Sequence, residues 1–438
     1  MLISINGWLW GPVSCGIFLM IGILLTVKTR FFQFLHIRRW LVGSIQSLFR
    51  KTGSEKLNGF TEMQSLSTAL AATLGTGNIV GVATAIVSGG PGAVFWMWVA
   101  AVFGMMTKYA EVLLSVYYRK KGAQGSGPMY VLADGLGNKP LAIFYAFFCL
   151  IASFGIGNMS QGNSISMAFQ SSFHVPPMVT GVIIMGLAAI VLLGGMKRLG
   201  TVTERLIPWM AGFYLFFSVF VLLTRYDQVP LAFSVIFKEA FRFRSVGGGA
   251  LGYTAMLAMR YGVARGIFTN EAGLGTSSMA HSACEDGDAV TLGMMGIFEV
   301  FIDTIVVCTI TALVILTTGV LGSGESGAAL TISAFSVGLG AFAEWFICIS
   351  IGLFAFASIL SWCFYGERCA QYLWGRRAAG IYRFVYILMI GVGCVMSLDT
   401  VWNLCDIFNA LMAIPNLTGV LVLRGQVWQI TKEYLHGS

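Results

Sequence analysis

Long apolar stretches separated by short polar segments run through the whole chain. An α-helix needs roughly 20 mainly apolar residues to cross a bilayer, and eleven stretches come close to that length or exceed it. They cover residues 8–27, 66–88, 92–117, 141–170, 177–195, 203–224, 249–279, 289–320, 341–370, 382–397 and 400–423. This pattern predicts an all-α integral membrane protein with about 11 transmembrane helices, folded as one transmembrane domain over residues 1–438.

The composition agrees with this prediction. Hydrophobic residues make up 57% of the chain and charged residues only 11%, whereas soluble domains carry about 25% charged residues. A chain with so few charges cannot cover a surface that faces water, so we expect membrane lipid around most of it. No hydrophilic segment is long enough to form a separate soluble domain.

The net charge of +8 is distributed in a way that indicates membrane topology rather than nucleic-acid binding. If the N-terminus is outside, 20 of the 27 basic residues fall on the cytoplasmic face and four on the opposite face, as the enrichment of lysine and arginine in cytoplasmic loops requires. Basic residues follow the first apolar stretch and none precedes it, which argues against a cleaved signal peptide. We expect a multi-pass protein of the plasma (inner) membrane with its N-terminus outside, its C-terminus in the cytoplasm and no nucleic-acid partner.

The sequence does not indicate an enzyme. The nine cysteines and four histidines are scattered along the chain, without the spacing of a metal site. The one close pair of carboxylates within the apolar stretches, Glu299 and Asp303, has neither histidine nor cysteine beside it in the sequence.

Two of the apolar stretches are interrupted by glycine and polar residues. The second contains the run Leu74 to Asn78, and the seventh contains the run Thr269 to Gly275. They are the first members of two successive units of five stretches, and an odd number of spans gives the two units opposite orientations in the membrane. Paired interrupted helices in inverted repeats indicate a secondary transporter with its site near the middle of the membrane. We therefore divide the chain into an extra helix over 8–27, repeat one over 66–224 and repeat two over 249–423.

The first interruption has two readings. Gly75 and Gly77 permit close packing of helices through small residues, or they break the helix so that freed amide groups bind a carboxylate at the positive end of the second half. Asn78 adds an amide that hydrocarbon would not accept without a partner.

The second interruption is harder to explain by packing alone. Thr269, Asn270 and Glu271 follow one another, and backbone carbonyls there are candidates to accept an ammonium group or a cation. Glu271 is a functional candidate because ionisable groups are costly to bury in a membrane. A pairing with Arg265 or Arg260 is at least as good an expectation.

Other charged residues in the apolar stretches have weaker assignments. Lys108 and Glu111 lie one helical turn apart, so we expect them to pair. Glu299 and Asp303 are spaced to share a helix face, and they serve either a proton or sodium role or a salt bridge in a gate. Asp406 fits gating or helix capping equally well.

Two uncharged polar residues also have alternative roles. The hydroxyl of Ser358 either bonds to its own helix or joins carbonyls of a broken helix in binding sodium, which needs several oxygen ligands. Gln161 is either a contact between helices or a substrate ligand.

Several longer runs resemble the alanine/glycine:cation symporter family, and the similarity covers nearly the whole chain. The most distinctive is Gly89 to Val99 (GGPGAVFWMWV). The others are Ala72 to Ile79 (ATLGTGNI), Gly266 to Gly273 (GIFTNEAG) and Trp362 to Glu367 (WCFYGE). The resemblance implies a LeuT-type fold of two inverted five-helix repeats plus one extra N-terminal helix, and sodium-coupled or, less often, proton-coupled uptake of alanine or glycine.

The resemblance also implies the residues of the site. The broken helix at Thr73 to Asn78 would hold the substrate carboxylate and one cation, the second interruption would receive the amino group, and Trp362 would limit side-chain size. The implied substrate ligands are Thr73, Gly75, Thr76, Gly77, Asn78, Gln161, Phe268, Thr269, Asn270 and Trp362. A second cation site would use Ala71, Leu74, Phe354 and Ser358, mostly through backbone carbonyls. Ala357 stands where the family commonly has a hydroxyl, which leaves the choice between sodium and a proton open.

We therefore predict symport of L-alanine, glycine or D-alanine with a cation, sodium or a proton, by alternating access in a monomer. A transporter of the same fold for another small zwitterion is one alternative. An uncoupled facilitator or channel is the other.

Overall fold

The computed structural model of this chain describes residues 9–49, 59–119, 125, 127–242, 253–285, 287–396 and 398–437. Within these residues the regular elements are helices, and the β pairing consists of one isolated bridge between Phe60 and Cys284. The all-α prediction is therefore confirmed for the described part of the chain.

The first half of the chain forms short helices, one broken helix and several long helices. These are α2 (Pro12–Lys28), α3 (Phe32–Leu35), α4 (Ile37–Phe49), α5 (Glu62–Thr73), the 3₁₀ turn η2 (Thr76–Asn78), α6 (Val80–Gly89), α7 (Ala93–Tyr117), α8 (Pro128–Tyr130), the π-helix η3 (Val131–Gly135), α9 (Lys139–Phe154), the π-helix η4 (Gly155–Met159), α10 (Ser160–Phe173), α11 (Pro177–Leu192), α12 (Gly195–Thr224), the 3₁₀ turn η5 (Tyr226–Gln228) and α13 (Val229–Ala240).

The second half contains a second broken helix and a second set of long helices. These are α14 (Tyr253–Asn270), α15 (Thr276–His281), α16 (Ala289–Val300), the π-helix η6 (Phe301–Cys308), α17 (Thr309–Thr317), the 3₁₀ turn η7 (Val320–Ser323), α18 (Gly327–Leu339), α19 (Phe342–Trp374), α20 (Arg376–Val395), α21 (Leu398–Val422) and α22 (Arg424–Gly437).

Residues 8, 249–252 and 397 of the predicted stretches lie outside the described residues; in the rest, each of the eleven stretches coincides with a helix or with a chain of helices, but their lengths differ. Among the described residues, six helices are long and apolar enough to cross a membrane by themselves, and a seventh qualifies if the two pieces of the bent pair Asp406–Val422 and Arg424–His436 count as one span. The others are short, like α2 and α11, or broken. The protein is a multi-pass helical membrane protein, and the number of about 11 crossings stays a prediction.

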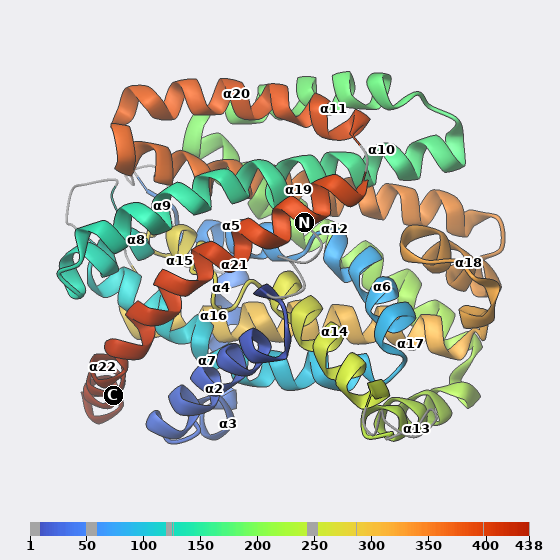
Figure 1. Cartoon of the computed structure of the whole chain (residues 1–438), viewed down its shortest axis with the longest axis horizontal. Coiled ribbons are helices and arrows are strands. Elements are labelled where there is room, and N and C mark those ends of the chain that lie inside the picture. Colours follow the sequence, from blue (N-terminus) through green and yellow to red (C-terminus); the bar gives the residue numbers. More distant parts are fainter. Residues whose placement is uncertain are drawn as a thin grey trace.

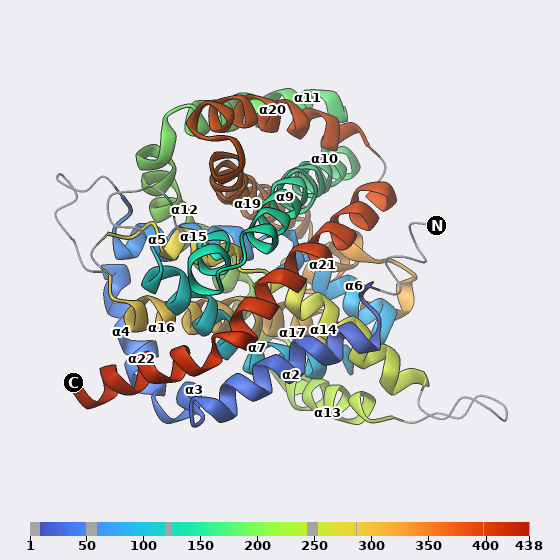
Figure 2. The same ribbon diagram turned by 60° about the vertical axis from the view of Figure 1, so that its left-hand side comes forward.

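The broken helices lie at the centre of the molecule (Figures 1 and 2). α5 packs against α15, and α6 packs against α14, so the first half of each broken helix contacts the second half of the other. Long helices surround this centre: α11 and α20 pack together on one side, and α2 packs on α7 on the other (Figure 2).

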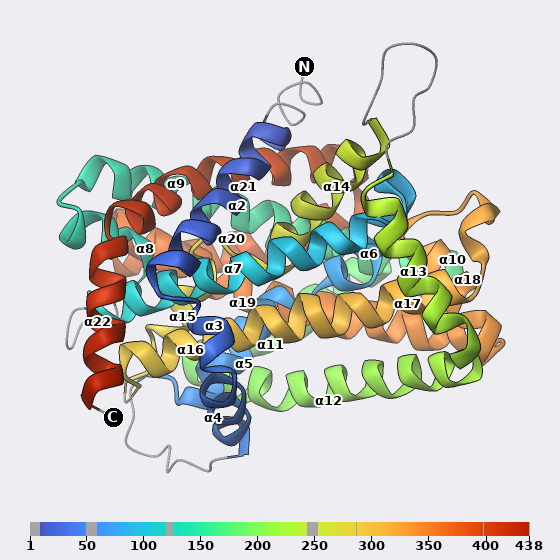
Figure 3. The same ribbon diagram turned by 90° about the horizontal axis from the view of Figure 1, so that it is seen from below.

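The short helices gather at the two ends of the long ones. Figure 3 shows α4 and α22 at one end, with α13 and α18 at the opposite end. The apolar pattern did not predict these four helices as spans, and with 12 to 14 residues each they are shorter than a bilayer crossing requires.

Local sequence signals explain where two of the central helices begin. Thr61 and Gln64 form a capping box at the start of α5. The backbone N–H of Gln64 donates to Thr61 Oγ1 at 3.2 Å, and the backbone N–H of Thr61 donates to Gln64 Oε1 at 3.3 Å. Asp288 caps α16 by accepting from the amides of Val290 and Thr291, both at 2.9 Å.

Candidate functional site

The first break replaces one helical turn with an extended residue and a tight turn. α5 ends at Thr73, and Gly75 is extended before the turn at Thr76–Asn78. The side chain of Asn78 holds this shape because its Oδ1 accepts from the Gly75 amide at 3.0 Å. The helix-break interpretation of the sequence is therefore confirmed. Thr76 Oγ1 is buried and has no hydrogen-bond partner among the described residues, so it is a hydroxyl with spare capacity at the break.

The backbone of this break approaches three other helices closely. A Cβ at Gly75 would lie 2.6 Å from Ser358 Oγ of α19 and 3.5 Å from Gln161 Oε1 of α10. A Cβ at Gly77 would lie 2.7 Å from Thr269 Cγ2 of α14. Glycine is needed at both positions for these close approaches. The structure thus brings together five predicted residues, namely Gly75, Gly77, Gln161, Thr269 and Ser358.

Gln161 contacts the first break through its side-chain amide. Its Oε1 accepts from the Thr76 amide at 3.3 Å, and its Nε2 donates to the Ile156 carbonyl at 3.0 Å. Ile156 lies in η4, where the wider π turn leaves a carbonyl accessible to a side chain.

The second break follows α14 directly. The side chain of Asn270 holds this break in shape. Its Oδ1 accepts from the Ala272 amide at 3.0 Å, and its Nδ2 donates to Thr304 Oγ1 at 3.2 Å. Two glycines in the break, Gly273 and Gly275, have φ of +99° and +77°, which glycine adopts without steric cost. The predicted interruption is therefore confirmed, but it lies at Glu271 to Gly275, because Thr269 and Asn270 still belong to α14.

Glu271 has the same kind of backbone conformation without being a glycine. Its φ is +56°, a left-handed conformation that costs a non-glycine residue of order 1–3 kcal/mol. Both carboxylate oxygens are bonded, with Trp362 Nε1 donating to Oε1 at 2.8 Å and Thr276 Oγ1 donating to Oε2 at 2.5 Å. The expected pairing with Arg265 or Arg260 is therefore wrong.

The two arginines are directed to aromatic rings instead. The guanidinium carbon of Arg260 lies 5.6 Å from the ring centroid of Tyr261, and that of Arg265 lies 5.5 Å from the ring of Phe268. Phe268 is a predicted substrate ligand and is buried at the end of α14.

Asp303 joins the two breaks, a contact that the sequence did not reveal. Asn78 Nδ2 donates to Asp303 Oδ1 at 2.6 Å, and Thr304 Oγ1 donates to Oδ2 at 2.7 Å. Thr304 in turn accepts from Asn270 of the second break. Asp303 lies in η6, a π-helix that starts two residues before it. The wider π turn changes the angle between the side chains of Glu299 and Asp303 around the helix axis. The two residues therefore have separate partners rather than a common one.

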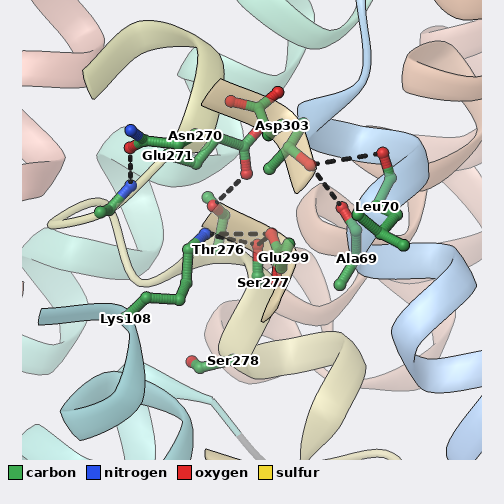
Figure 4. A network of polar contacts seen from close by, with 12 residues as sticks. Ala69, Leu70, Lys108, Asn270, Glu271, Thr276, Ser277, Ser278, Glu299 and Asp303 are labelled. Carbon is green, nitrogen blue, oxygen red and sulfur yellow. Dashed lines mark hydrogen bonds and ion pairs between the residues drawn. The ribbon is translucent and has the colours of Figure 1, made fainter. Parts of the chain in front are cut away.

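Glu299 takes part in a buried ion pair with Lys108. The Lys108 ammonium lies 3.2 Å from Glu299 Oε1 and donates to Ser277 Oγ at 2.8 Å (Figure 4). Ser277 donates to the same carboxylate oxygen at 2.7 Å, and His281 Nε2 lies 3.4 Å from Glu299 Oε2. The salt-bridge alternative for Glu299 is confirmed as a contact, and it ties α7, α15 and α16 together.

The predicted pairing of Lys108 with Glu111 is wrong. Glu111 accepts from Asn416 Nδ2 at 2.5 Å, and Asn416 also donates to the Gly273 carbonyl at 2.9 Å. The two residues are one turn apart on α7, but Lys108 contacts α15 and α16 whereas Glu111 contacts α21. Asp406 is placed on α21, and its backbone carbonyl accepts from Trp10 Nε1 at 2.8 Å.

Ser358 bonds across to the first broken helix rather than to its own. Its Oγ donates to the Ala71 carbonyl at 3.1 Å and to the Ala72 carbonyl at 3.3 Å. Three oxygens thus converge where α5 ends, which suits a hard cation that prefers oxygen ligands. Ala72 was missing from the predicted set.

The remaining predicted residues are less informative. Leu74 caps α5 and Phe354 lies one turn before Ser358, with its ring 5.4 Å from that of Tyr214. Thr73 Oγ1 bonds back to its own helix, at 3.3 Å from the Leu70 carbonyl and 3.4 Å from that of Ala69 (Figure 4). The roles of these three residues in binding stay predictions.

Known proteins resemble this chain over almost its whole length. A model of the sodium:alanine symporter family matches residues 1–438. The sodium/alanine symporter AgcS of Methanococcus maripaludis is 42% identical, with 98% of this chain and 96% of the relative covered. An uncharacterized transporter of Haemophilus influenzae is 42% identical over 99% and 95%. The probable sodium/glutamine symporter GlnT of Bacillus subtilis is 34% identical over 98% and 89%.

A solved structure shares the fold. MhsT, crystallised in complex with L-phenylalanine, matches with a TM-score of 0.59 at 15% identity over 82% of this chain and 88% of its own. At this identity the likeness shows a LeuT-type fold and nothing about the substrate. The family is one of transporters rather than enzymes, and the chain is a member of the sodium:alanine symporter family.

Proposed function

We propose that this protein carries a small neutral amino acid, alanine or glycine, together with sodium across the plasma (inner) membrane by alternating access. The observation that carries the proposal is the meeting of two helix breaks, at Gly75–Asn78 and at Glu271–Gly275, with Gln161 and Ser358 beside them. The family and the name of its relative AgcS support sodium and alanine, whereas the name of GlnT indicates that side-chain preference differs among relatives.

In this proposal the substrate carboxylate binds at the first break. The positive end of a half-helix favours an anion. The Thr76 hydroxyl, which has no partner in the described part of the chain, adds a donor there. The backbone of Gly75 and Gly77 allows close approach because neither carries a side chain. Thr73, Asn78 and Gln161 complete this part of the substrate site.

The amino group of the substrate binds at the end of α14, at Phe268, Thr269 and Asn270. The last carbonyls of a helix carry partial negative charge and attract a cation. Trp362 bounds the end of the site that receives the side chain.

Sodium binds between α5 and α19. Ser358 Oγ and the carbonyl of Ala71 are ligands, and the carbonyls of Leu74 and Phe354 complete the set. The Ala72 carbonyl, 3.3 Å from Ser358 Oγ, is an additional candidate. Sodium binding at this place stabilises the end of α5 and so the shape of the first break, which couples the cation to the substrate.

We further propose that residues 66–224 and 249–423 are inverted repeats, with 8–27 as an extra helix. The crossed packing of α5 on α15 and of α6 on α14 supports this division, because an antiparallel pair of equivalent broken helices would make such contacts. The N-terminus is outside and the C-terminus cytoplasmic, and a monomer carries the whole site.

Reconstituted protein tests the proposal. Proteoliposomes with an inward sodium gradient should accumulate labelled alanine or glycine above the outside concentration, and collapse of the gradient should abolish accumulation. Accumulation driven by a proton gradient alone would replace sodium by protons. Equilibration without accumulation under either gradient would identify a facilitator and refute symport.

A further inference from the structure

Trp362 is fixed from two sides in the middle of α19. Its indole N–H donates to Glu271 Oε1 at 2.8 Å, and its side chain is only 1% exposed. On the other side it lies against η4, where a Cβ at Gly157 would be 2.0 Å from Trp362 Cβ and 2.1 Å from Cγ. The backbone of η4 therefore limits the ring in one direction, and Glu271 limits it in another.

Glu271 is itself held in one orientation. Its second oxygen accepts from Thr276 Oγ1 at 2.5 Å, and Thr276 is the first residue of α15 (Figure 4). A carboxylate with both oxygens bonded to different elements has little freedom to rotate, so it defines the position of the group that donates to it.

The backbone at Glu271 favours glycine, as its φ of +56° shows. A buried carboxylate in such a conformation is unfavourable in two ways, through steric strain and through desolvation. An observed backbone outlier of this kind points to a role for the side chain. The hydrogen bonds with Trp362 and Thr276 identify that role.

We propose that Glu271 is a positioning residue that fixes the indole of Trp362 and thereby sets how large a substrate side chain the transporter accepts. The inference rests on the proposed function, in which Trp362 bounds the side-chain end of the site. Without the acceptor, the buried indole N–H loses its hydrogen bond, and such a group turns toward another partner. The wall that Trp362 forms then moves, and larger substrates fit.

A purely structural role for Glu271 is the alternative, because its bond to Thr276 anchors the start of α15. The two roles give different results. Loss of an anchor lowers transport of every substrate by the same factor, whereas loss of positioning changes the ratio between large and small substrates.

Competition against labelled alanine uptake separates these roles. Glu271→Met keeps the length of the side chain and removes the acceptor, while Glu271→Gln keeps an oxygen for Trp362 and offers an N–H to Thr276 Oγ1. We expect the ratio of the inhibition constants of valine and alanine to fall by about tenfold or more in the Met variant, since one methylene in an apolar site changes discrimination by roughly 10- to 200-fold. The Gln variant should keep the wild-type ratio.

A matched control is Glu433→Met, since Glu433 lies on the exposed face of α22 with Gln429 Nε2 at 3.0 Å; it should leave the ratio unchanged. If the Met variant of Glu271 is not recovered folded, Thr276→Val frees one carboxylate oxygen and should lower the ratio in the same direction by a smaller factor. An unchanged ratio in the variant that folds overturns the inference. Wild-type protein that neither transports nor is stabilised by any small neutral amino acid refutes the proposed function and this inference with it.

Discussion

The buried ion pair between Lys108 and Glu299 gives the sharpest prediction on stability. Both side chains are completely buried, and the ammonium and the carboxylate are 3.2 Å apart. Lys108→Met removes the charge and retains most of the apolar stem. Ser277 and His281 then remain as partners of Glu299, but neither a hydroxyl nor an imidazole at 3.4 Å replaces a full ammonium charge.

Breaking a buried pair by removing one partner costs about 3–5 kcal/mol, because the other charge stays buried without compensation. We expect a loss of this size in the free energy of unfolding for Lys108→Met, and a similar loss for Glu299→Gln. Combining both substitutions removes both charges, so the double variant should lose no more than either single variant. The measurement is denaturant unfolding of the purified protein in detergent, arranged as a double-mutant cycle.

The Arg383–Glu367 pair is the control. Its atoms are 2.6 Å apart, but the side chains are 22% and 26% exposed, and pairs that water reaches contribute about 0–1 kcal/mol. Arg383→Met should therefore cost much less than Lys108→Met. Equal losses for the two pairs, or additive losses for Lys108→Met and Glu299→Gln, would refute the reasoning.

Two further predictions concern the site. Gly157→Ala places a Cβ 2.0 Å from Trp362 Cβ, so it should lower the unfolding midpoint and reduce alanine uptake, with overpacking costing about 1–3 kcal/mol. Its control, Gly186→Ala on α11, meets no atom within 4 Å and should leave the midpoint unchanged or raise it. Ser358→Ala should raise the sodium concentration for half-maximal uptake severalfold with little loss of folded protein. Ser350→Ala should not, since the Ser350 hydroxyl donates to the Phe346 carbonyl of its own helix at 2.7 Å. An unaltered sodium dependence would remove Ser358 from the ligands.

The breaks could be predicted from the sequence because their signals are local. Glycines and amides amid apolar residues, as at Gly75 to Asn78 and at Asn270 to Gly275, are costly in a membrane helix unless the helix is interrupted. A local signal also explains why the start of α7 near Ala93 could be predicted, because the turn at Gly90 and Pro91 comes directly before it.

Partners of buried charges could not be predicted in the same way. The spacing of Lys108 and Glu111 shows that they lie near one helix face, but the choice of partner depends on which helices pack there. α15 and α16 bring Ser277 and Glu299 to the lysine, and α21 brings Asn416 to the glutamate. Glu271 is similar, because Trp362 is 91 residues away in the chain.

The pattern of apolar residues also could not predict the π-helices. η6 has apolar sequence on both sides, whereas η4 (GIGNM) is followed by the polar run Ser160 to Ser164. In neither case does hydropathy distinguish a π-helix from an α-helix, because the two differ in hydrogen-bond spacing. They nevertheless decide which side chains face the centre: η4 supplies the Ile156 carbonyl to Gln161, and η6 carries Asp303.

The crossed packing of the broken helices gives the two ends of the molecule separate mechanical contacts. α5 and α15 meet toward the end that carries α4 and α22, while α6 and α14 meet toward the end that carries α13 and α18 (Figure 3). We call each of these two contacts a seam. Because both helices are interrupted between the two seams, the helices of one seam can separate while those of the other stay packed. A covalent tether across a single seam should therefore hold one end of the molecule shut and leave the other end free to move.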